Sequence, residues 1–339
     1  MVGATGQIGR AVVESLAGDG WAVTAMHTGR TEAPGTWAGL GVDEGLVDRA
    51  STGFDALLGE GADLVVDCIA YDDADGRRLL DHASDLGAVV VVSSASVYAD
   101  DQGRTLDEAT GVHDFPDFGG PVAEDAPTVA AGPATYSSRK RGLEEVLLSD
   151  GRLPTTVLRP CAVHGVGSTM PRELWPLLRA RARRPRLPLA FDGVSTFHTT
   201  SAVNLAELVR IVAACPGTRL VNHGDPDSRP VREIVQLVAA TVGHRFELLP
   251  FHGPSPGDGV GASPWSVARP LVVDMAAAAA LGYRPVTSYA SAVVDTCRWT
   301  NDRLDAAPGW QDAFAQMAPA YGSHFADTEA EDRWLARRS

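Results

Sequence analysis

Gly3-Ala4-Thr5-Gly6-Gln7-Ile8-Gly9 follows Met1-Val2 at the start of the chain, and its glycines recur at every third residue. Glycine accepts a positive φ and lets a backbone approach a phosphate closely, while the free N–H groups of a helix N-terminus attract an anion. The stretch therefore predicts a turn that holds a diphosphate, with a glycine-rich turn that binds no ligand as the alternative. A helix is predicted directly behind it, because apolar residues continue at helical spacing: Ile8, Ala11, Val12 and Leu16.

Short β-rich runs alternate with helical stretches through the first half of the chain. This order predicts the α/β class, with a Rossmann-type doubly wound parallel sheet and a smaller C-terminal substrate lobe. Because only Met1 and Val2 precede the glycine turn, either the start is trimmed or the first strand is a stub. The other predicted strands of this half are Ala22–Met26, Leu64–Ile69, Val89–Ser93 and Thr155–Leu158.

The length of 339 residues accommodates a nucleotide-binding domain and a second lobe. We assign residues 1–165 to an NAD(P)-binding Rossmann domain, with an unpatterned insertion at about 99–132. Residues 166–300 are assigned mainly to the substrate-binding lobe, with 197–223 returning to the Rossmann domain. Residues 301–339 are expected to form a C-terminal helical extension.

The overall composition excludes several classes of protein. The net charge of −14 disfavours nucleic acid as a partner. No apolar run is long enough to cross a membrane and no signal-peptide pattern occurs, so we expect a soluble cytoplasmic protein. The four cysteines are far apart and the nine histidines lack metal-like spacing, so we expect reduced thiols and no metal.

The segment His27-Thr28-Gly29-Arg30 follows the second predicted strand, where NAD and NADP are commonly told apart. An acidic residue there would bond the ribose 2′-OH, whereas an arginine would accept a 2′-phosphate. No carboxylate occurs before Glu32, so Arg30 favours NADP over NAD unless its side chain points into solvent. Asp48 is a candidate for the adenine end, with an exposed loop aspartate as the alternative.

A candidate catalytic set lies farther along the chain. The buried strand Val89–Val92 delivers Ser94 to its carboxyl end, the edge at which open α/β sheets bind ligands. Tyr136 and Lys140 are four residues apart and so share one helix face. A tyrosine that acts as a base near neutral pH needs a cation nearby to stabilise its phenolate, and Lys140 can supply one. Ser94 would hold the substrate oxygen beside the phenol.

The chain resembles the extended short-chain dehydrogenase/reductases, the group of the nucleotide-sugar epimerases and dehydratases. The resemblance spans the chain to about Trp299 and rests on the glycine turn, Ser93–Tyr98, Tyr136–Lys140, Leu158–Gly165 and Leu281–Pro285. It implies that Ser94, Tyr136 and Lys140 are catalytic and that a homodimer forms through the helices near Tyr136. The cofactor residues implied by the turn and the resemblance together are Gly3, Thr5, Gly6, Gln7, Ile8, Gly9, Ile69, Ala70, Tyr71, Pro160 and Val163.

The substrate side is expected to include Ser96, His164, Arg172 and His198. A run of arginines from Arg172 to Arg186 could receive a substrate diphosphate or form a solvated helix face. His164 stands where the family usually has tyrosine, and Asp100–Gly120 resembles an insertion. These departures put a standard sugar-nucleotide substrate in doubt.

We therefore predict an NAD(P)-dependent oxidoreductase that acts on a carbonyl or carbinol group of a small molecule, in secondary metabolism. One alternative is a nucleotide-sugar epimerase or dehydratase that retains NAD tightly. Another is a dinucleotide-sensing regulator without chemistry, although such proteins commonly lose the tyrosine and lysine that this chain keeps.

Overall fold

The larger lobe is built around one parallel sheet. The structure is a computed structural model that describes residues 1–338. Its strands run in the order β2, β1, Val2, β3, β4, β5, β9, where Val2 bridges β1 and β3 as a stub of a central strand. The predicted Rossmann-type fold is therefore confirmed. The strands are β1 Thr24–His27, β2 Asp43–Leu46, β3 Val65–Asp67, β4 Val89–Val92, β5 Thr155–Pro160 and β9 Arg219–His223.

Both faces of the sheet are covered by helices, which explains the continuous run of four valines in β4. Val90 joins one apolar core with Val209, whereas Val89 and Val91 join another with Leu143. Successive side chains of a strand point to opposite faces, so each face of β4 buries valine. The first core contains α1 Gln7–Gly18, α2 Thr36–Leu40 and α7 Ala202–Ala214, and the second contains α3 Thr52–Gly59, α4 Asp73–Leu80 and α5 Tyr136–Asp150.

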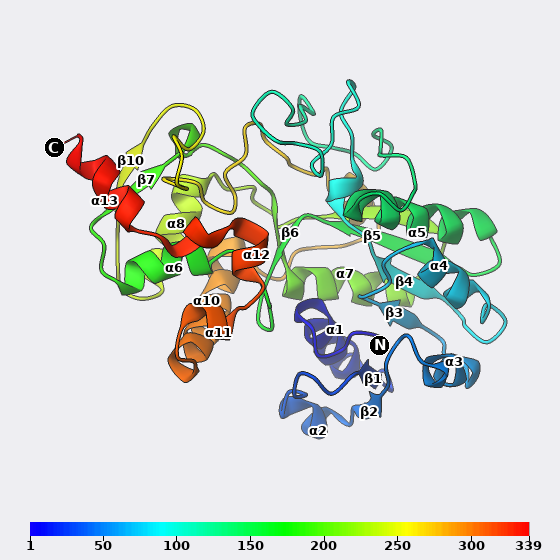
Figure 1. Ribbon diagram of the computed structural model, residues 1–339. Helices are drawn as coiled ribbons and strands as arrows, with labels where there is room; N and C mark the ends of the chain where they lie inside the picture. The colour runs from blue at the N-terminus through cyan, green and yellow to red at the C-terminus, as the bar shows by residue number, and fades with distance from the viewer. Residues whose placement is uncertain (339) are drawn as a thin grey trace.

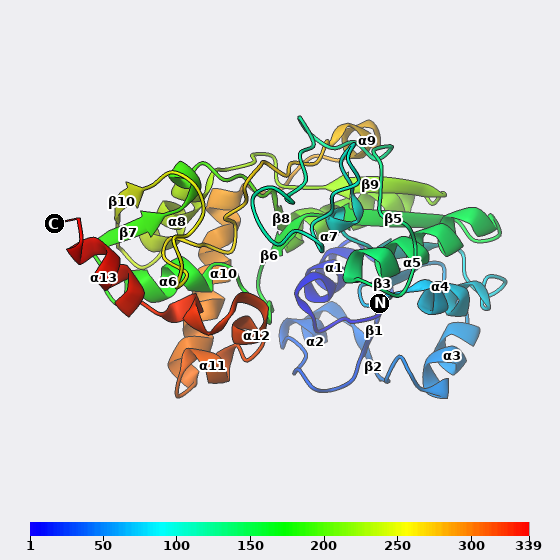
Figure 2. The ribbon, with the colours of Figure 1, turned by 45° about the horizontal axis from the view of Figure 1, so that its top comes forward.

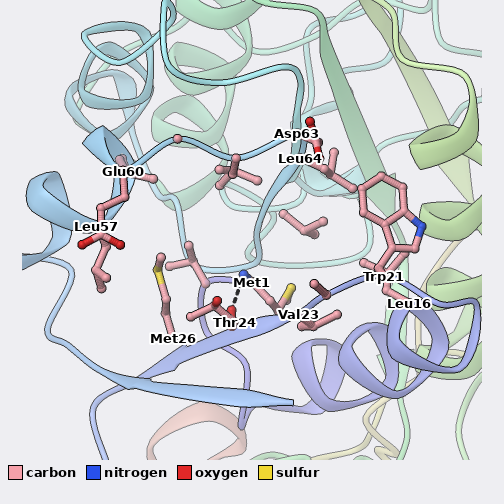
Figure 3. A pocket seen from close by; sticks show the side chains of 17 residues that line it. Met1, Leu16, Trp21, Val23, Thr24, Met26, Leu57, Glu60, Asp63 and Leu64 are labelled. Carbon is pink, nitrogen blue, oxygen red and sulfur yellow. Dashed lines mark hydrogen bonds between the residues drawn. The ribbon is translucent and has the colours of Figure 1, made fainter. Parts of the chain in front are cut away.

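The two residues before the glycine turn occupy the central position of the sheet. The Val2 N–H donates to the Val66 carbonyl at 2.8 Å, and the Met26 N–H donates to the Met1 carbonyl at 2.7 Å. A cavity of about 250 Å³ lies beside this stub, bordered by β1 and by the segment that leads into β3. Figure 3 shows Met1, Trp21 and Leu64 around it.

The smaller lobe has its own apolar core and lies to the left of the larger lobe in Figure 1. Its only paired strands within residues 1–338 are β7 and β10, which run parallel. Helix α10 crosses residue 300, where the C-terminal extension was expected to begin. The lobe contains α6 Leu174–Arg181, β7 Arg186–Leu189, η2 Phe191–Gly193, α8 Val231–Ala240, β10 Glu247–Pro250, α10 Tyr289–Ala306, α11 Trp310–Ala313, α12 Met317–Tyr321, η3 Ser323–Ala326 and α13 Glu329–Ala336.

A short parallel pair connects the two lobes, formed by β6 Ala162–His164 and β8 Thr199–Ser201 (Figures 1 and 2). Residues 197–223 then enter the larger lobe, where α7 packs on α1 and β9 extends the sheet. The region 99–132 follows η1 Ala95–Val97 and forms bends and turns above α5, without a helix. The remaining helix, α9 Ala276–Ala280, lies near β9.

Candidate active site

The glycine turn is shaped so that only glycine fits at its ends. Gly3 has φ +74°, and a Cβ on Gly9 would lie 2.1 Å from the Gly3 carbonyl oxygen. The Gly6 N–H closes the turn on that same oxygen at 3.1 Å, and α1 begins at Gln7 without a side-chain cap. The first N–H groups of α1 therefore stay open beside a close-packed backbone, which fits a dinucleotide diphosphate.

The segment after β3 borders the same edge of the sheet. Ile69 and Tyr71 are exposed there, while the N–H groups of Ile69 and Ala70 both donate to Oδ1 of the buried Asp67. Arg49 pairs with Asp67 and holds it from the other side. Burial raises the pKa of Asp67, and Arg49 opposes this shift. The sequence did not indicate this support, because Arg49 and Asp67 lie on separate segments of the chain.

Ser94, Tyr136 and Lys140 converge at the carboxyl ends of the central strands. Tyr136 is the first residue of α5, has 43% of its surface exposed and lies next to Ser94 in the lining of one cavity. The Lys140 Nζ donates to the carbonyl oxygens of Ala70 at 2.7 Å and Val92 at 2.8 Å. The structure thus brings together the three residues that the sequence pattern singled out.

The electrostatics of these residues follow from their burial. Burial lowers the pKa of Lys140 to about 8, and partial desolvation raises the pKa of Tyr136 while the neighbouring Ser94 hydroxyl opposes that rise. Lys140 is the only lysine among the 339 residues, although arginine is abundant. An ammonium is more compact than a guanidinium, and its pKa shifts more readily on burial.

Hydrogen bonds of Ser137 connect the start of α5 to Ser96 and to the insertion. The Ser137 hydroxyl donates to Ser96 Oγ at 2.8 Å, and the Ser137 N–H donates to Asp107 at 2.8 Å. Ser96 is therefore bonded to the residue that follows Tyr136. Asp107 belongs to the region without periodicity and could not be placed from sequence.

A cavity of about 510 Å³ opens beside Ser94 and Tyr136, and we call it the main cavity. Burial raises the pKa of its Cys161 thiol to about 12, so this group is neutral. Arg172 is therefore the one ionised side chain in a lining that is otherwise apolar or neutral. The lining residues are Gln7, Ser94, Ala95, Ser96, Leu106, Tyr136, Cys161, Ala162, Val163, Ser168, Thr169, Met170, Arg172 and Phe197.

His164 and His198 do not line this cavity, contrary to the expected substrate contacts. His164 is buried and bonds Asp225 at 2.8 Å, and the His198 Nε2 bonds the Asp225 carbonyl oxygen at 2.8 Å. Burial acts to lower the pKa of His164, but Asp225 outweighs it and the net direction is upward. Burial lowers the pKa of His198. Both histidines instead anchor the β6–β8 connection through Asp225.

The predicted arginine cluster is also dispersed. Arg179 is fully buried against Glu331, and most of the other arginines of the run face elsewhere. Arg172 alone among the described residues of this cluster lines the cavity. The others with partners are Arg181 with Asp305, Arg183 with the Gly243 carbonyl, and Arg184 with Asp332.

The remaining cofactor candidates lie around the outer end of the glycine turn. Arg30 is exposed after β1 and lines a second cavity, of about 530 Å³, together with Arg10 and Arg303. Asp48 is exposed, and its Oδ1 accepts a bond from the Ala50 N–H. Pro160 ends β5 and precedes Cys161, which lines the cavity beside Tyr136.

No three histidine, cysteine or acidic side chains within residues 1–338 are grouped closely enough to hold a metal ion. Over the same range, no helix is both long and apolar enough to span a membrane.

Comparisons with known proteins bear on the family and the fold of this chain. A profile of the NAD-dependent epimerase/dehydratase family matches residues 1–212. A 2-alkyl-3-oxoalkanoate reductase from Stenotrophomonas maltophilia (strain K279a) is 35% identical over 120 residues, which is 32% of this chain and 35% of that relative. The match thus spans about a third of the relative's length.

Solved structures share the fold over most of the chain. A dTDP-glucose 4,6-dehydratase from Streptomyces venezuelae, solved with NAD, is 19% identical, has a TM-score of 0.64, and covers 91% of this chain and 98% of its own. A UDP-glucuronic acid 4-epimerase from Bacillus cereus, solved with UDP-glucuronic acid and NAD, is 16% identical and has a TM-score of 0.63. The match covers 89% of this chain and 98% of the epimerase. At these identities the likeness establishes the fold alone.

Proposed function

Because this chain belongs to the NAD-dependent epimerase/dehydratase family, we propose that it is an NADP-dependent reductase or dehydrogenase of a carbonyl or carbinol group. The observation that carries the proposal is the contact between Tyr136 and Ser94 at the mouth of the main cavity, with the buried Lys140 beneath them. These groups can hold a substrate oxygen and move a proton to or from it.

Each residue has a distinct part in this reaction. The bound dinucleotide supplies or accepts the hydride. The Tyr136 hydroxyl exchanges a proton with the substrate oxygen, and the Ser94 hydroxyl holds that oxygen in place. The Lys140 ammonium, fixed by two backbone carbonyls, stabilises the phenolate of Tyr136 through its charge.

The cofactor is proposed to be NADP rather than NAD. Arg30 follows β1 with no carboxylate between the strand and itself, and the three arginines of its cavity, Arg10, Arg30 and Arg303, outnumber the two carboxylates, Glu32 and Asp312. An arginine at this position can accept a 2′-phosphate, whereas ribose hydroxyls are usually bonded by an acidic side chain. The glycine turn would hold the diphosphate of either dinucleotide.

The substrate is proposed to be a small carbonyl compound. The relative from Stenotrophomonas maltophilia is named as a reductase of 2-alkyl-3-oxoalkanoates, and the apolar lining of the main cavity fits an alkyl substituent. We retain a cytoplasmic location, a role in secondary metabolism and a homodimer as parts of this proposal.

A second candidate is a nucleotide-sugar epimerase or dehydratase with retained NAD. It is favoured by the Bacillus cereus epimerase, which shares the fold and was solved with UDP-glucuronic acid and NAD. The two candidates differ in turnover: a reductase consumes NADPH stoichiometrically, whereas an epimerase shows no net change in its dinucleotide.

The test is to purify the protein, identify any dinucleotide that copurifies, and follow NADPH oxidation on a panel of ketones and aldehydes. We expect weakly held or absent NAD and net NADPH consumption. Tyr136→Phe should lower the rate at least about 100-fold while leaving NADPH binding intact. Tyr321→Phe, in the smaller lobe, is the matched control and should leave the rate unchanged. Tightly bound NAD without NADPH consumption on any carbonyl would support the epimerase instead.

A further inference from the structure

We infer that Arg172 recognises a single carboxylate, and that the substrate is a small oxo acid or hydroxy acid whose reacting carbon lies beside Tyr136. This inference deepens the proposed reductase function and rests on it. Its starting point is the position of Arg172 in the main cavity, which also contains Ser94 and Tyr136.

The guanidinium of Arg172 is left without an anion by the fold. Its Nε is buried and has no hydrogen-bond partner, and no carboxylate within residues 1–338 pairs with it. The adjacent Glu173 is buried and instead accepts a bond from the Tyr289 hydroxyl at 3.2 Å. Withdrawing part of an unpaired guanidinium from water is unfavourable, so its position is best explained by an anionic ligand that pairs with it.

An aromatic ring positions this guanidinium. Arg172 Cζ lies 5.7 Å from the centre of the Phe197 ring, which also lines the cavity. A cation above a ring face is held there without losing its hydrogen-bonding N–H groups. Those groups remain available to a planar carboxylate, which arginine binds through two parallel bonds.

The count of charges favours a monoanion over the diphosphate of a nucleotide sugar. Arg179, Arg181 and Arg184 of the same segment are paired with acidic residues outside the cavity. One unpaired guanidinium balances one carboxylate, whereas a diphosphate would retain uncompensated charge in a cavity that has no other cationic side chain in its lining. Leu106, Met170 and Phe197 provide surface for an alkyl chain instead.

The chemical step leaves the carboxylate unchanged. In the reductive direction, a hydride passes from the reduced dinucleotide to the ketone carbon, and the Tyr136 hydroxyl gives its proton to the ketone oxygen. The products are a hydroxy acid and the oxidised dinucleotide, with the carboxylate still bound to Arg172.

The experiment compares 3-oxohexanoate with its methyl ester, which removes the charge and keeps the carbon chain. The kcat/KM of NADPH oxidation is measured for the native protein, Arg172→Met, Arg172→Lys and the control Arg181→Met. Arg181 belongs to the same arginine run and pairs with Asp305 outside the cavity. Calorimetry with the NADP⁺-loaded protein measures binding of 3-hydroxyhexanoate and its methyl ester independently of turnover.

We expect the native protein to prefer the acid, and Arg172→Met to lower kcat/KM and affinity for the acid about 10- to 100-fold. The ester should change less than about threefold, Arg172→Lys should retain part of the preference, and Arg181→Met should match the native protein. Equal use and equal binding of acid and ester by the native protein would overturn the inference, even with reductase activity present. Selective binding of the acid that depends on Arg172, without NADPH oxidation on any carbonyl, would instead remove the reductase proposal and leave the anion site.

Discussion

The Lys140 ammonium lies over the ring of Tyr136, with Nζ 5.8 Å from the ring centre. Two backbone carbonyls fix the ammonium, one from the segment after β3 and one from the end of β4. The sheet therefore sets the position of the charge, and the single turn of α5 between the two residues sets its relation to the phenol.

The buried ammonium should titrate unusually early. Because Lys140 is the only lysine, selective ¹³C labelling of lysine side chains gives one amine resonance. Burial lowers the pKa of Lys140 to about 8, so we expect its titration midpoint near that pH, well below that of an exposed lysine. A midpoint at or above about 10 in the NMR titration would show that the ammonium is solvated.

The same shift predicts how stability depends on pH. The pKa of Lys140 is lower in the folded protein than in the unfolded chain, so the unfolded chain binds the proton more tightly. The loss of folding stability caused by the buried charge is therefore complete below about pH 8. Relative to Lys140→Met, the native protein should gain up to about 3 kcal/mol of unfolding free energy between about pH 8 and 10.5. Urea unfolding at several pH values measures this difference, and a difference that stays constant across the range would contradict it.

Gly9→Ala should abolish dinucleotide binding and destabilise the protein. Its methyl group would lie 2.1 Å from the Gly3 carbonyl oxygen, so the turn must open. Gly18→Ala is the matched control at the other end of α1, because no heavy atom lies within 4 Å of its new methyl group. We expect the control to bind NADPH normally and to gain up to about 1 kcal/mol, as measured by fluorescence titration and thermal unfolding.

Arg30→Ser should shift the cofactor preference from NADPH toward NADH. Loss of the guanidinium removes the expected partner of the 2′-phosphate, so KM for NADPH should rise about 10- to 100-fold while KM for NADH changes little. Arg298→Ser removes an equally charged residue that pairs with Asp295 on the exposed side of α10, and should change neither constant. Steady-state kinetics with both dinucleotides measures the ratio, and equal effects on both would contradict a role at the 2′-phosphate.

The buried pair Arg159–Glu144 should be sensitive to loss of one partner. Both side chains are almost fully buried, and Glu144 also accepts a bond from Ser93 at 2.6 Å. Arg159→Met removes the buried guanidinium and leaves Glu144 with only the more exposed Arg141, at 3.3 Å, so it should cost about 3–5 kcal/mol in denaturant unfolding. Arg152→Met breaks an exposed pair with Asp150 and should leave the unfolding midpoint nearly unchanged. A similarly small effect of both variants would indicate that Glu144 becomes protonated or hydrated.

Much of the larger lobe was predictable because its signals are local. The glycine spacing of the turn, the valine run of β4 and the four-residue separation of Tyr136 and Lys140 each depend on neighbouring residues. Backbone sterics and strand periodicity act over such distances, so α1, β4 and the start of α5 could be placed without tertiary contacts. Strand β2 was missed because Asp43–Leu46 is short, largely exposed and not apolar.

The substrate side was harder to predict because it depends on pairing across the chain. His164 and His198 are polar residues near the family's substrate motifs, yet both turn toward Asp225, which is more than twenty residues away from either. The positions of the histidines in the sequence do not show that a carboxylate from another loop will pack against them in the fold.

By itself, the sequence determined the Rossmann-type sheet, the glycine turn at the start of α1 and the presence of a serine, a tyrosine and a lone lysine in a fixed order. These depend on local sterics and on the alternation of side chains along strands and helices. Only the tertiary structure decided which arginine of the 172–186 run faces the main cavity, because carboxylates from α13 and α10 pair with Arg179, Arg181 and Arg184. Charge pairing acts through space rather than along the chain, and it leaves Arg172 as the unpaired cation beside Tyr136.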